Sequence, residues 1–319
     1  AERPAVDEAL LSESLARLFA FNRQQPDWQR LAAAQAVRRR LAVISGGPGT
    51  GKTTTVVRLL AALLEQPGGE RLAIGLAAPT GKAAARMAEA IRNAKAELPL
   101  ADHLKALLPE EARTLHRLLG SRGDSPAVRH DAARPLALDV LVVDEASMVD
   151  LEMMAAVLAA LPPGARLVLL GDKDQLASVE AGAVLGELCR RAQQGHYSAD
   201  SVAWLAGVTG EEVGAELIDP AGRPIDQAVA MLRHSYRFGG DSGIGQLAAA
   251  VNAGSVDGVR RALAHGHADL TRLALADVGE GALRRLVIDG IPGGKESPQG
   301  YRHYLDVVRK QRPPAGTDQ

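Results

Sequence analysis

A glycine-rich octapeptide constrains the fold of this chain more than any other feature of its sequence. The segment GGPGTGKT, from Gly46 to Thr53, matches the pattern G-x-x-x-x-G-K-[ST]. It follows the apolar run Leu41–Ile44, which is typical of a buried strand, and it leads into Thr53–Glu65, which has helical spacing. The complete motif between a strand and a helix predicts a phosphate-binding loop. The alternative is an ordinary glycine-rich turn between two such elements.

The physical chemistry of such a loop assigns roles to its residues. Glycines allow the backbone to point N–H groups at phosphate oxygens, and the start of the following helix adds about half a positive charge. Lys52 is placed to reach the outer phosphates of ATP, and the hydroxyl of Thr53 is placed to bind Mg²⁺. These residues alone predict a magnesium-dependent ATPase of the P-loop class.

Strand-like and helix-like segments alternate along the first part of the chain. Apolar runs without polar alternation indicate buried strands, and segments with helical spacing follow them. This order predicts an α/β fold, with a parallel sheet covered by helices on both faces. The expected strands are 41–44, 71–78, 138–143 and 166–170, and the expected helices are 6–21, 27–40, 53–65, 82–97 and 151–161, with two more inside 224–252.

Polar side chains follow two of the expected strands. Asp144 and Glu145 come directly after 138–143, and Gln175 lies in the cluster GDKDQ after 166–170. Open parallel sheets bind ligands at the carboxyl ends of their strands, so we expect these residues near the phosphate loop. Asp144 would hold Mg²⁺, Glu145 would polarise the attacking water, and Gln175 would contact the γ-phosphate. The alternatives are surface acids after a strand and an ordinary Gly-Asp turn.

Composition narrows the remaining possibilities. A hydrophobic content of 46% is enough for a sizeable core, and the single cysteine, Cys189, excludes an internal disulfide and a multi-cysteine zinc site. No apolar run approaches the roughly 20 residues of a membrane span. These features predict a cytoplasmic protein without a membrane contact. No aromatic residue lies between Trp28 and Tyr197, so single strands cannot be bound there by aromatic stacking.

Seven sequence blocks, in this order, resemble superfamily 1 DNA helicases and most closely the RecD family, the alpha subunits of exodeoxyribonuclease V. The resemblance covers essentially all of residues 5–255. The blocks are ISGGPGTGKTTT at 44–55, LAAPTGKAAAR at 76–86, TLHRLLG at 114–120, LVVDEAS at 141–147, GDKDQLASVEAG at 171–182, SYRF at 235–238 and SGIGQLAAA at 242–250.

The resemblance implies further site residues. Gln29 would read the adenine edge, Tyr236 would stack near adenine, and Arg237 would reach the γ-phosphate from a second motor domain. Gln175 would couple the nucleotide state to DNA. The phosphates would be held by Gly46, Gly47, Pro48, Gly49, Thr50, Gly51, Lys52, Thr53 and Thr54, and single-stranded DNA would be contacted by Pro79, Thr80, Lys82, Thr114 and His116. Taken alone, Lys82 could be a solvated lysine and His116 a core histidine.

The resemblance also implies a domain organisation. It predicts an N-terminal helical segment at 1–27 and a RecA-like ATP-binding motor domain at 28–195, with a small insertion at about 120–135. A connector would occupy 196–225, and the start of a mainly helical, truncated second motor domain would occupy 226–319. The distal helicase motifs are not found after residue 255. We therefore expect Arg237 to lie far from the phosphate loop.

The function implied by the resemblance is that of a motor. It would translocate 5′ to 3′ on single-stranded DNA, with ATP and Mg²⁺, beside the beta and gamma chains of exodeoxyribonuclease V in double-strand-break repair. No nuclease cluster of acids and lysine is present. We expect this chain alone to hydrolyse ATP slowly. The alternatives are another P-loop enzyme, such as a switch or a kinase, and a non-catalytic fragment that binds nucleotide and partners.

Overall fold

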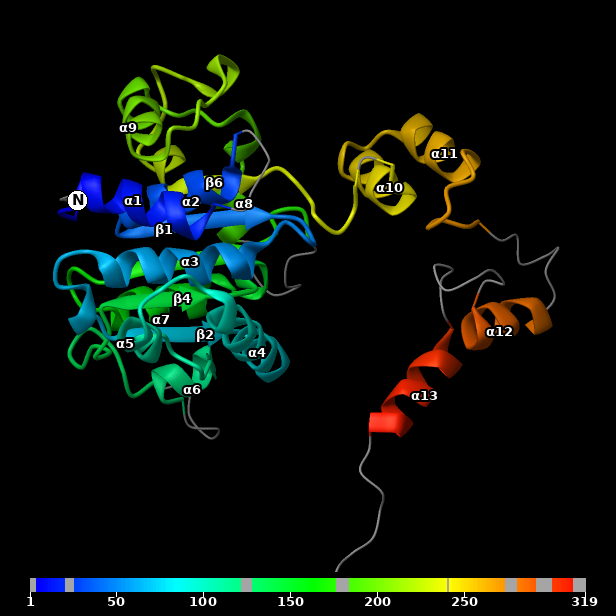
Figure 1. The fold of residues 1–319 in the computed structure, drawn as a ribbon, viewed down its shortest axis with the longest axis horizontal. Helices are drawn as coiled ribbons and strands as arrows, with labels where there is room; N and C mark the ends of the chain where they lie inside the picture. The colour runs from blue at the N-terminus through cyan, green and yellow to red at the C-terminus, as the bar shows by residue number, and fades with distance from the viewer. Residues whose placement is uncertain are drawn as a thin grey trace, which may run out of the picture. The chain divides into compact units, whose positions relative to one another are not determined.

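The structure is a computed structural model that describes residues 4–20, 26–121, 128–175, 184–239, 241–272, 280–290 and 300–311. The chain forms two compact units, Ala1–Arg237 and Phe238–Gln319. The first unit contains the phosphate loop and a six-stranded sheet (Figure 1). None of the described helices combines the length and the apolar character that are needed to cross a bilayer.

All strands of the sheet are parallel, in the order β3-β2-β4-β5-β1-β6. Strand β1 lies next to β5, where Leu41 pairs with Leu167, and next to β6, where Val43 pairs with Val229. The expected strands correspond to β1, β2, β4 and β5. The strands are β1 (Leu41–Gly46), β2 (Ile74–Ala78), β3 (Arg113–Thr114), β4 (Val140–Val143), β5 (Arg166–Gly171) and β6 (Val229–Leu232).

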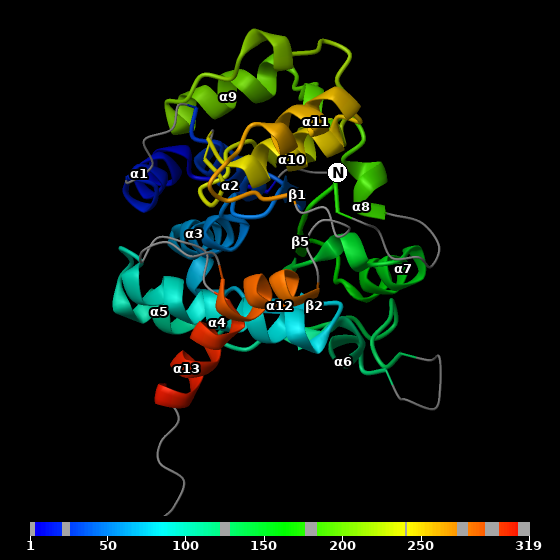
Figure 2. The same ribbon diagram turned by 90° about the vertical axis from the view of Figure 1, so that its right-hand side faces the viewer.

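Two hydrophobic cores cover the two faces of this sheet, because alternate residues of each strand point to opposite sides. In β1, Ile44 belongs to the core under α1, α2, α3, α4, α5 and α9, whereas Val43 belongs to the core under α6, α7 and α8. Both cores are well buried, which gives the three-layer α/β arrangement that the sequence predicts (Figures 1 and 2). The fold is that of a RecA-like P-loop domain.

The helices of the first unit begin mostly at side-chain caps. Asp27 accepts hydrogen bonds at the start of α2, Thr80 at the start of α4 and Asp150 at the start of α7. These helices are α1 (Glu8–Leu18), α2 (Trp28–Val37), α3 (Lys52–Glu65), α4 (Gly81–Glu97), α5 (Asp102–Leu107), α6 (Leu115–Leu119), α7 (Leu151–Ala160), α8 (Val184–Leu188) and α9 (Ala199–Thr209). Short 3-10 helices occur at Gly69–Arg71, Ala146–Met148, Ala192–Gln194, Ala215–Leu217 and Asp226–Ala228.

Strand β6 corrects the sequence-based expectation of two helices inside 224–252. The segment Val229–Leu232 is buried and extends the sheet by pairing with β1. Gln35 of α2 fixes the start of this strand, because its amide donates to the carbonyl oxygens of Gln227 at 2.6 Å and of Val229 at 3.3 Å. The compact unit that contains β6 extends through Arg237, beyond residue 226, where we expect the second motor domain to begin.

The described part of the second unit contains four helices. They are α10 (Gly243–Asn252), α11 (Val256–Ala264), α12 (Glu280–Asp289) and α13 (Tyr301–Gln311). Asp269 closes the start of α10, where its carboxylate accepts from the Ser242 hydroxyl at 2.6 Å and from the Gly243 N–H at 2.8 Å. These contacts lower the pKa of Asp269, led by the bond from Ser242. The helical character of this unit agrees with the sequence.

Candidate nucleotide-binding site

The phosphate loop turns between β1 and α3 with two residues in the left-handed region. Gly49 has φ 77° and Gly51 has φ 80°, conformations that a side chain would strain. A Cβ on Gly51 would lie 2.2 Å from the Gln29 amide nitrogen, and one on Gly46 would lie 2.5 Å from the Thr50 hydroxyl. The glycines are therefore required by backbone conformation and by close packing, as in an anion-binding loop.

Lys52 lies across the loop that it follows. Its ammonium donates to the carbonyl oxygens of Gly46 at 2.6 Å and of Gly47 at 3.3 Å. The Thr50 hydroxyl donates to Gly47 O at 2.9 Å, and the Gln29 amide donates to Thr50 O at 2.9 Å. The loop is thus stabilised by hydrogen bonds from its own Thr50 and Lys52 and from Gln29 of α2, and the positive charge of Lys52 lies against it.

The acid pair lies at the carboxyl end of β4, as expected. The Glu145 N–H donates to the Asp144 carboxylate at 2.9 Å. Burial raises the pKa of Asp144, and the charge of Glu145 acts in the same direction, whereas the N–H of Glu145 and the charge of Lys52 oppose it. Glu145, directly after the end of β4, has φ 51°, which is an uncommon conformation for a residue with a side chain. Its side chain lines the cavity described below.

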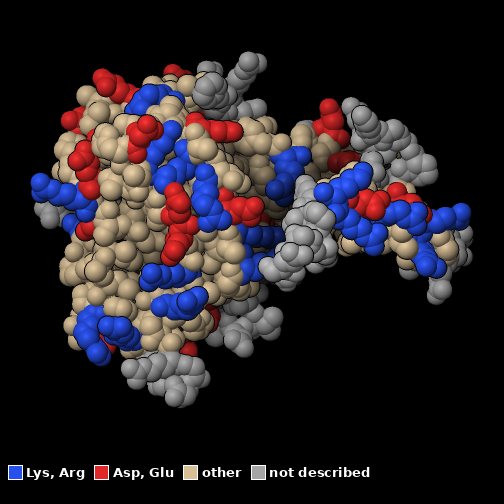
Figure 3. Space-filling model, turned by 60° about the horizontal axis from the view of Figure 1, so that its bottom comes forward, with Lys and Arg blue, Asp and Glu red and all other residues tan. Residues whose placement is uncertain are grey.

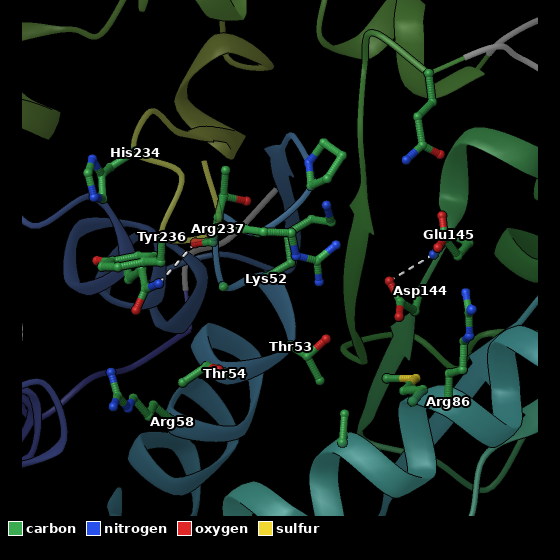
Figure 4. Close-up of a pocket in the computed structure, with 18 residues that line it drawn as sticks. Lys52, Thr53, Thr54, Arg58, Arg86, Asp144, Glu145, His234, Tyr236 and Arg237 are labelled. Atoms are coloured by element: carbon green, nitrogen blue, oxygen red, sulfur yellow. Dashed lines mark hydrogen bonds between the residues drawn. The ribbon is translucent and has the colours of Figure 1, made fainter. Parts of the chain in front are cut away.

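One cavity of about 1010 Å³ brings the loop, the acids and the segment after β6 together. Figure 4 shows Lys52 and Arg237 on one side of it, Asp144 and Glu145 on the other, and Thr53 between them. The lining residues are Gln29, Pro48, Gly49, Thr50, Gly51, Lys52, Thr53, Thr54, Arg58, Arg86, Met87, Ala90, Asp144, Glu145, Gln175, His234, Tyr236 and Arg237. Gly46 and Gly47 are not among the lining residues, and they contribute the carbonyl groups that Lys52 binds.

Arg237 corrects the expectation that it would lie far from the loop. The Tyr236 N–H donates to Gly49 O at 2.8 Å, and the Ser235 hydroxyl donates to Pro48 O at 3.0 Å. A Cβ on Gly49 would lie 2.3 Å from the Cβ of Arg237. The reason is that β6 runs parallel to β1 and ends at the same sheet edge, so the first unit itself brings Arg237 to the loop.

The residues expected to contact DNA lie at the neighbouring part of the same edge. Strands β2 and β3 are adjacent, with Ala78 opposite Thr114, and Pro79 and Thr80 follow directly. Thr80 and Thr114 cap the starts of α4 and α6, where they accept from Ala83 N–H and Arg117 N–H. Lys82 and His116 are exposed, so His116 is not a core histidine. Part of the expected insertion, 122–127, lies outside the described residues.

Five cavity residues have no role in the sequence analysis. Arg58 lies on α3, His234 comes after β6, and Arg86, Met87 and Ala90 lie on α4. Burial lowers the pKa of the Arg58 guanidinium, and nearby Asp27 and Tyr236 oppose the shift. The His234 ring meets the Tyr236 ring edge to face at 4.7 Å between centroids. Arg86 falls inside the block at 76–86, so the sequence carried a signal for it, whereas the other four residues lie outside the blocks.

Comparison with known proteins agrees with this geometry. Residues 29–181 match the family described as an AAA domain. The chain is therefore a P-loop NTPase domain with a RecA-like fold. It belongs to the RecD family. It is 41% identical to the RecBCD enzyme subunit RecD of Haemophilus influenzae over 95% of this chain, and 47% identical to that of Mycobacterium tuberculosis H37Rv over 73% of this chain.

These relatives are longer than the chain. The matched region is 46% of the Haemophilus influenzae protein and 35% of the Mycobacterium tuberculosis protein, so this chain spans less than half of their length. Among solved structures, Bacteroides Pif1 bound to ssDNA is similar over 74% of this chain and 47% of that chain, at 18% identity and a TM-score of 0.39. A structural similarity this low adds nothing to what the sequence identity with the RecD proteins shows.

Proposed function

We propose that this chain is an ATP-hydrolysing motor domain of a RecD-type DNA helicase, which moves 5′ to 3′ on single-stranded DNA. The observation that carries the proposal is the single cavity in which Lys52, the acid pair and Arg237 face one another. Membership of the RecD family supports DNA as the track. The same membership favours the beta and gamma chains of exodeoxyribonuclease V as partners, and the cytoplasm as the compartment of double-strand-break repair.

The residues present fit Mg²⁺-ATP. The loop leads into the start of α3 and offers Lys52 for the phosphates, and Thr53 with Asp144 supplies the oxygen atoms that Mg²⁺ prefers. Mg²⁺ bound there would neutralise charge on the phosphate oxygens. Among the described residues no cluster of three His, Cys, Asp or Glu side chains could hold a metal alone.

Each side chain in the cavity has a separate role in ATP hydrolysis. Glu145 orients the attacking water and accepts its proton, while Gln175 contacts that water or the γ-phosphate. Lys52 and Arg237 stabilise the charge that develops on the transferred group. On the opposite side of the loop, Gln29 and Tyr236 bound the space for the adenine base. The backbone bond from Tyr236 to Gly49 ties this wall to the phosphate loop.

Two variants test the catalytic part. Lys52→Ala is expected to abolish binding of a fluorescent ATP analogue, because the main cation of the loop is lost. Glu145→Gln is expected to keep binding and to lower turnover by about 10²- to 10⁴-fold, the usual contribution of a general base. Lys105→Ala, on α5 away from the cavity, is the control. Undiminished hydrolysis in Lys52→Ala would exclude the assignment.

The alternatives give different results in the same assay. A motor is expected to hydrolyse ATP faster when single-stranded DNA is added. A switch or kinase would show no such stimulation, and a non-catalytic fragment would bind the analogue without turnover. Direction is tested by displacement of streptavidin from biotin at either end of an oligonucleotide, where faster release from the 3′ end is expected.

A further inference from the structure

Strand β2 and helix α4 connect the proposed DNA edge with the acid pair. Strand β2 lies between β3 and β4 in the sheet. Thr114 ends β3 on one side, and Asp144 follows β4 on the other. The Asp144 N–H donates to the carbonyl oxygen of Ala77 in β2 at 2.9 Å. The strand that leads into α4 is therefore bonded directly to the backbone of the acid pair.

Arg86 lies where these two regions meet. It follows Lys82 by four residues on α4, so both side chains lie on the same face of the helix. Lys82 is exposed at the helix start, whereas Arg86 lines the cavity with Asp144 and Glu145. Figure 4 shows the Arg86 side chain extending from α4 toward the side of the cavity that holds Glu145. One helix face thus carries one cation at the DNA edge and another at the nucleotide site.

The charges of Arg86 and Glu145 are both available for a partner. Within the described part of the chain neither side chain forms a hydrogen bond or an ion pair. Helix α4 itself is fixed, because Ala84, Met87 and Ile91 are buried against the core. A guanidinium and a carboxylate form a strong paired hydrogen bond when their geometry allows it. Rotation of the two side chains, without movement of the helix, would decide whether they pair.

We propose that Arg86 couples DNA binding to hydrolysis by acting on Glu145, an inference that rests on the proposed function. Without DNA, the two side chains exchange between the unpaired positions seen in this structure and an ion pair, in which the guanidinium of Arg86 prevents Glu145 from accepting a proton from water. A DNA phosphate at Lys82 draws the same guanidinium toward the start of α4. Glu145 is then free to orient water at the γ-phosphate. Arg86 is a positioning residue, and Glu145 remains the group that acts on water.

Thermodynamic linkage provides a test that needs no turnover. If DNA and Glu145 compete for Arg86, then removing the Glu145 charge must tighten DNA binding. Glu145→Gln is expected to bind a fluorescent single-stranded oligonucleotide about two- to fivefold more tightly, the range for one exposed ion pair. This gain is expected to vanish when Arg86→Ala is added. Glu152→Gln, which removes an exposed carboxylate on α7, controls for the loss of one negative charge.

Steady-state hydrolysis gives a second readout. Arg86→Ala is expected to raise the rate without DNA, to reduce the stimulation by DNA, and to leave the KM for ATP unchanged. Arg86→Lys is expected to restore part of the stimulation. A higher KM for ATP in Arg86→Ala would make Arg86 a phosphate ligand and overturn the inference.

The binding experiment also separates this inference from the function on which it rests. If Glu145→Gln still binds the oligonucleotide more tightly when Arg86→Ala is also present, or if Glu152→Gln tightens binding equally, the gain in affinity comes from general charge repulsion. Either result would overturn the coupling and leave the proposed function standing. No DNA binding by the parent chain or any variant would refute the proposed function, and the coupling with it.

Discussion

Gly51 shows at the scale of one residue how little space surrounds the phosphate loop. Its backbone has φ 80°, and a methyl group there would meet the Gln29 amide at 2.2 Å. Gly68, at the end of α3, has the same φ of 80° with no atom within 4 Å of an added Cβ. The two glycines therefore separate the cost of backbone strain from the cost of contact with a neighbour.

Gly51→Ala is expected to destabilise the fold more than Gly68→Ala. In both variants the left-handed conformation of a non-glycine residue lowers the free energy of unfolding by about 1–2 kcal/mol. Gly51→Ala must also displace Gln29 from the Thr50 carbonyl, at about 1 kcal/mol more. Urea unfolding measures the difference, and nucleotide affinity should fall in Gly51→Ala alone. Equal loss of stability in the two variants would mean that Gln29 moves without cost.

Cys189 predicts a dependence of stability on alkaline pH. The thiol is completely buried, and burial raises its pKa to about 11 from 9.0. Because the folded pKa is the higher one, the unfolded chain ionises first, and stability is lost as the pH rises from about 9 to 11. The loss is expected to reach about 3 kcal/mol in urea unfolding at these pH values.

Cys189→Ala is the control for this dependence. The variant is expected to be less stable at pH 7, because it loses packing, but to lose less of its stability between pH 9 and 11. Burial also raises the pKa of Tyr197 to about 12, which adds a smaller loss above pH 10 in both proteins. A parent chain whose thiol reacts fully with a thiol reagent at pH 8 would contradict the burial of Cys189.

At the scale of elements, β6 has the largest effect on the site for its length. Its four residues extend the sheet and deliver His234, Tyr236 and Arg237 to the cavity wall. The strand depends on two buried polar side chains, because Gln35 and the Tyr197 hydroxyl both donate to Val229 O. The wall of the nucleotide site is therefore supported from α2 and from the segment before α9.

Gln35→Leu is expected to lower stability by about 1–3 kcal/mol, because the carbonyl oxygen of Gln227 loses its donor while buried. It is also expected to weaken nucleotide binding, since Tyr236 and Arg237 follow the loosened strand. Chemical unfolding and titration of a fluorescent ATP analogue measure the two effects. Gln194→Leu makes the same change at an exposed position and should alter stability by at most about 0.5 kcal/mol. Equal behaviour of both variants would remove Gln35 from this role.

The elements also show what the sequence could predict. Strands β1, β2, β4 and β5 are apolar runs bounded by turn residues, so periodicity predicts them. Strand β3 has two residues, which is too short for any pattern. Strand β6 is a four-residue apolar segment inside a stretch that we expect to be helical, and its pairing with β1 makes it a strand. The loop and the acids follow from local motifs, whereas Arg58 and Arg86 resemble ordinary helix-surface residues until the fold places them in the cavity.

At the scale of the whole molecule, positive and negative charges nearly balance, with a formal net charge of −1. On the face that Figure 3 draws, lysine and arginine side chains form several groups with acidic side chains between them. Long-range attraction of DNA is therefore weak, and local cations must provide the affinity. The absence of aromatic residues from 29 to 196 leaves phosphate and backbone contacts for the strand.

Binding of single-stranded DNA is consequently expected to depend on salt and to tolerate any base sequence. The logarithm of the affinity should fall with the logarithm of salt concentration, with a slope of about −0.7 for each phosphate neutralised. Fluorescence anisotropy with oligonucleotides of one base each, at several salt concentrations, measures both properties. Lys82→Ala should reduce the slope, and Lys105→Ala should not. Affinity that is independent of salt, or that varies strongly with the base, would contradict this mode of binding.

The left-handed backbone of Glu145 has a consequence for selection. A side chain at φ 51° opposes folding by roughly 1–2 kcal/mol, a cost that glycine avoids and asparagine reduces. A library of all residues at this position, screened for stability alone, is expected to return glycine and asparagine ahead of glutamate. A screen for ATP turnover should return glutamate. Selection for stability alone would thus remove the carboxylate that ATP turnover requires. A glutamate at this position is therefore expected only where activity is selected.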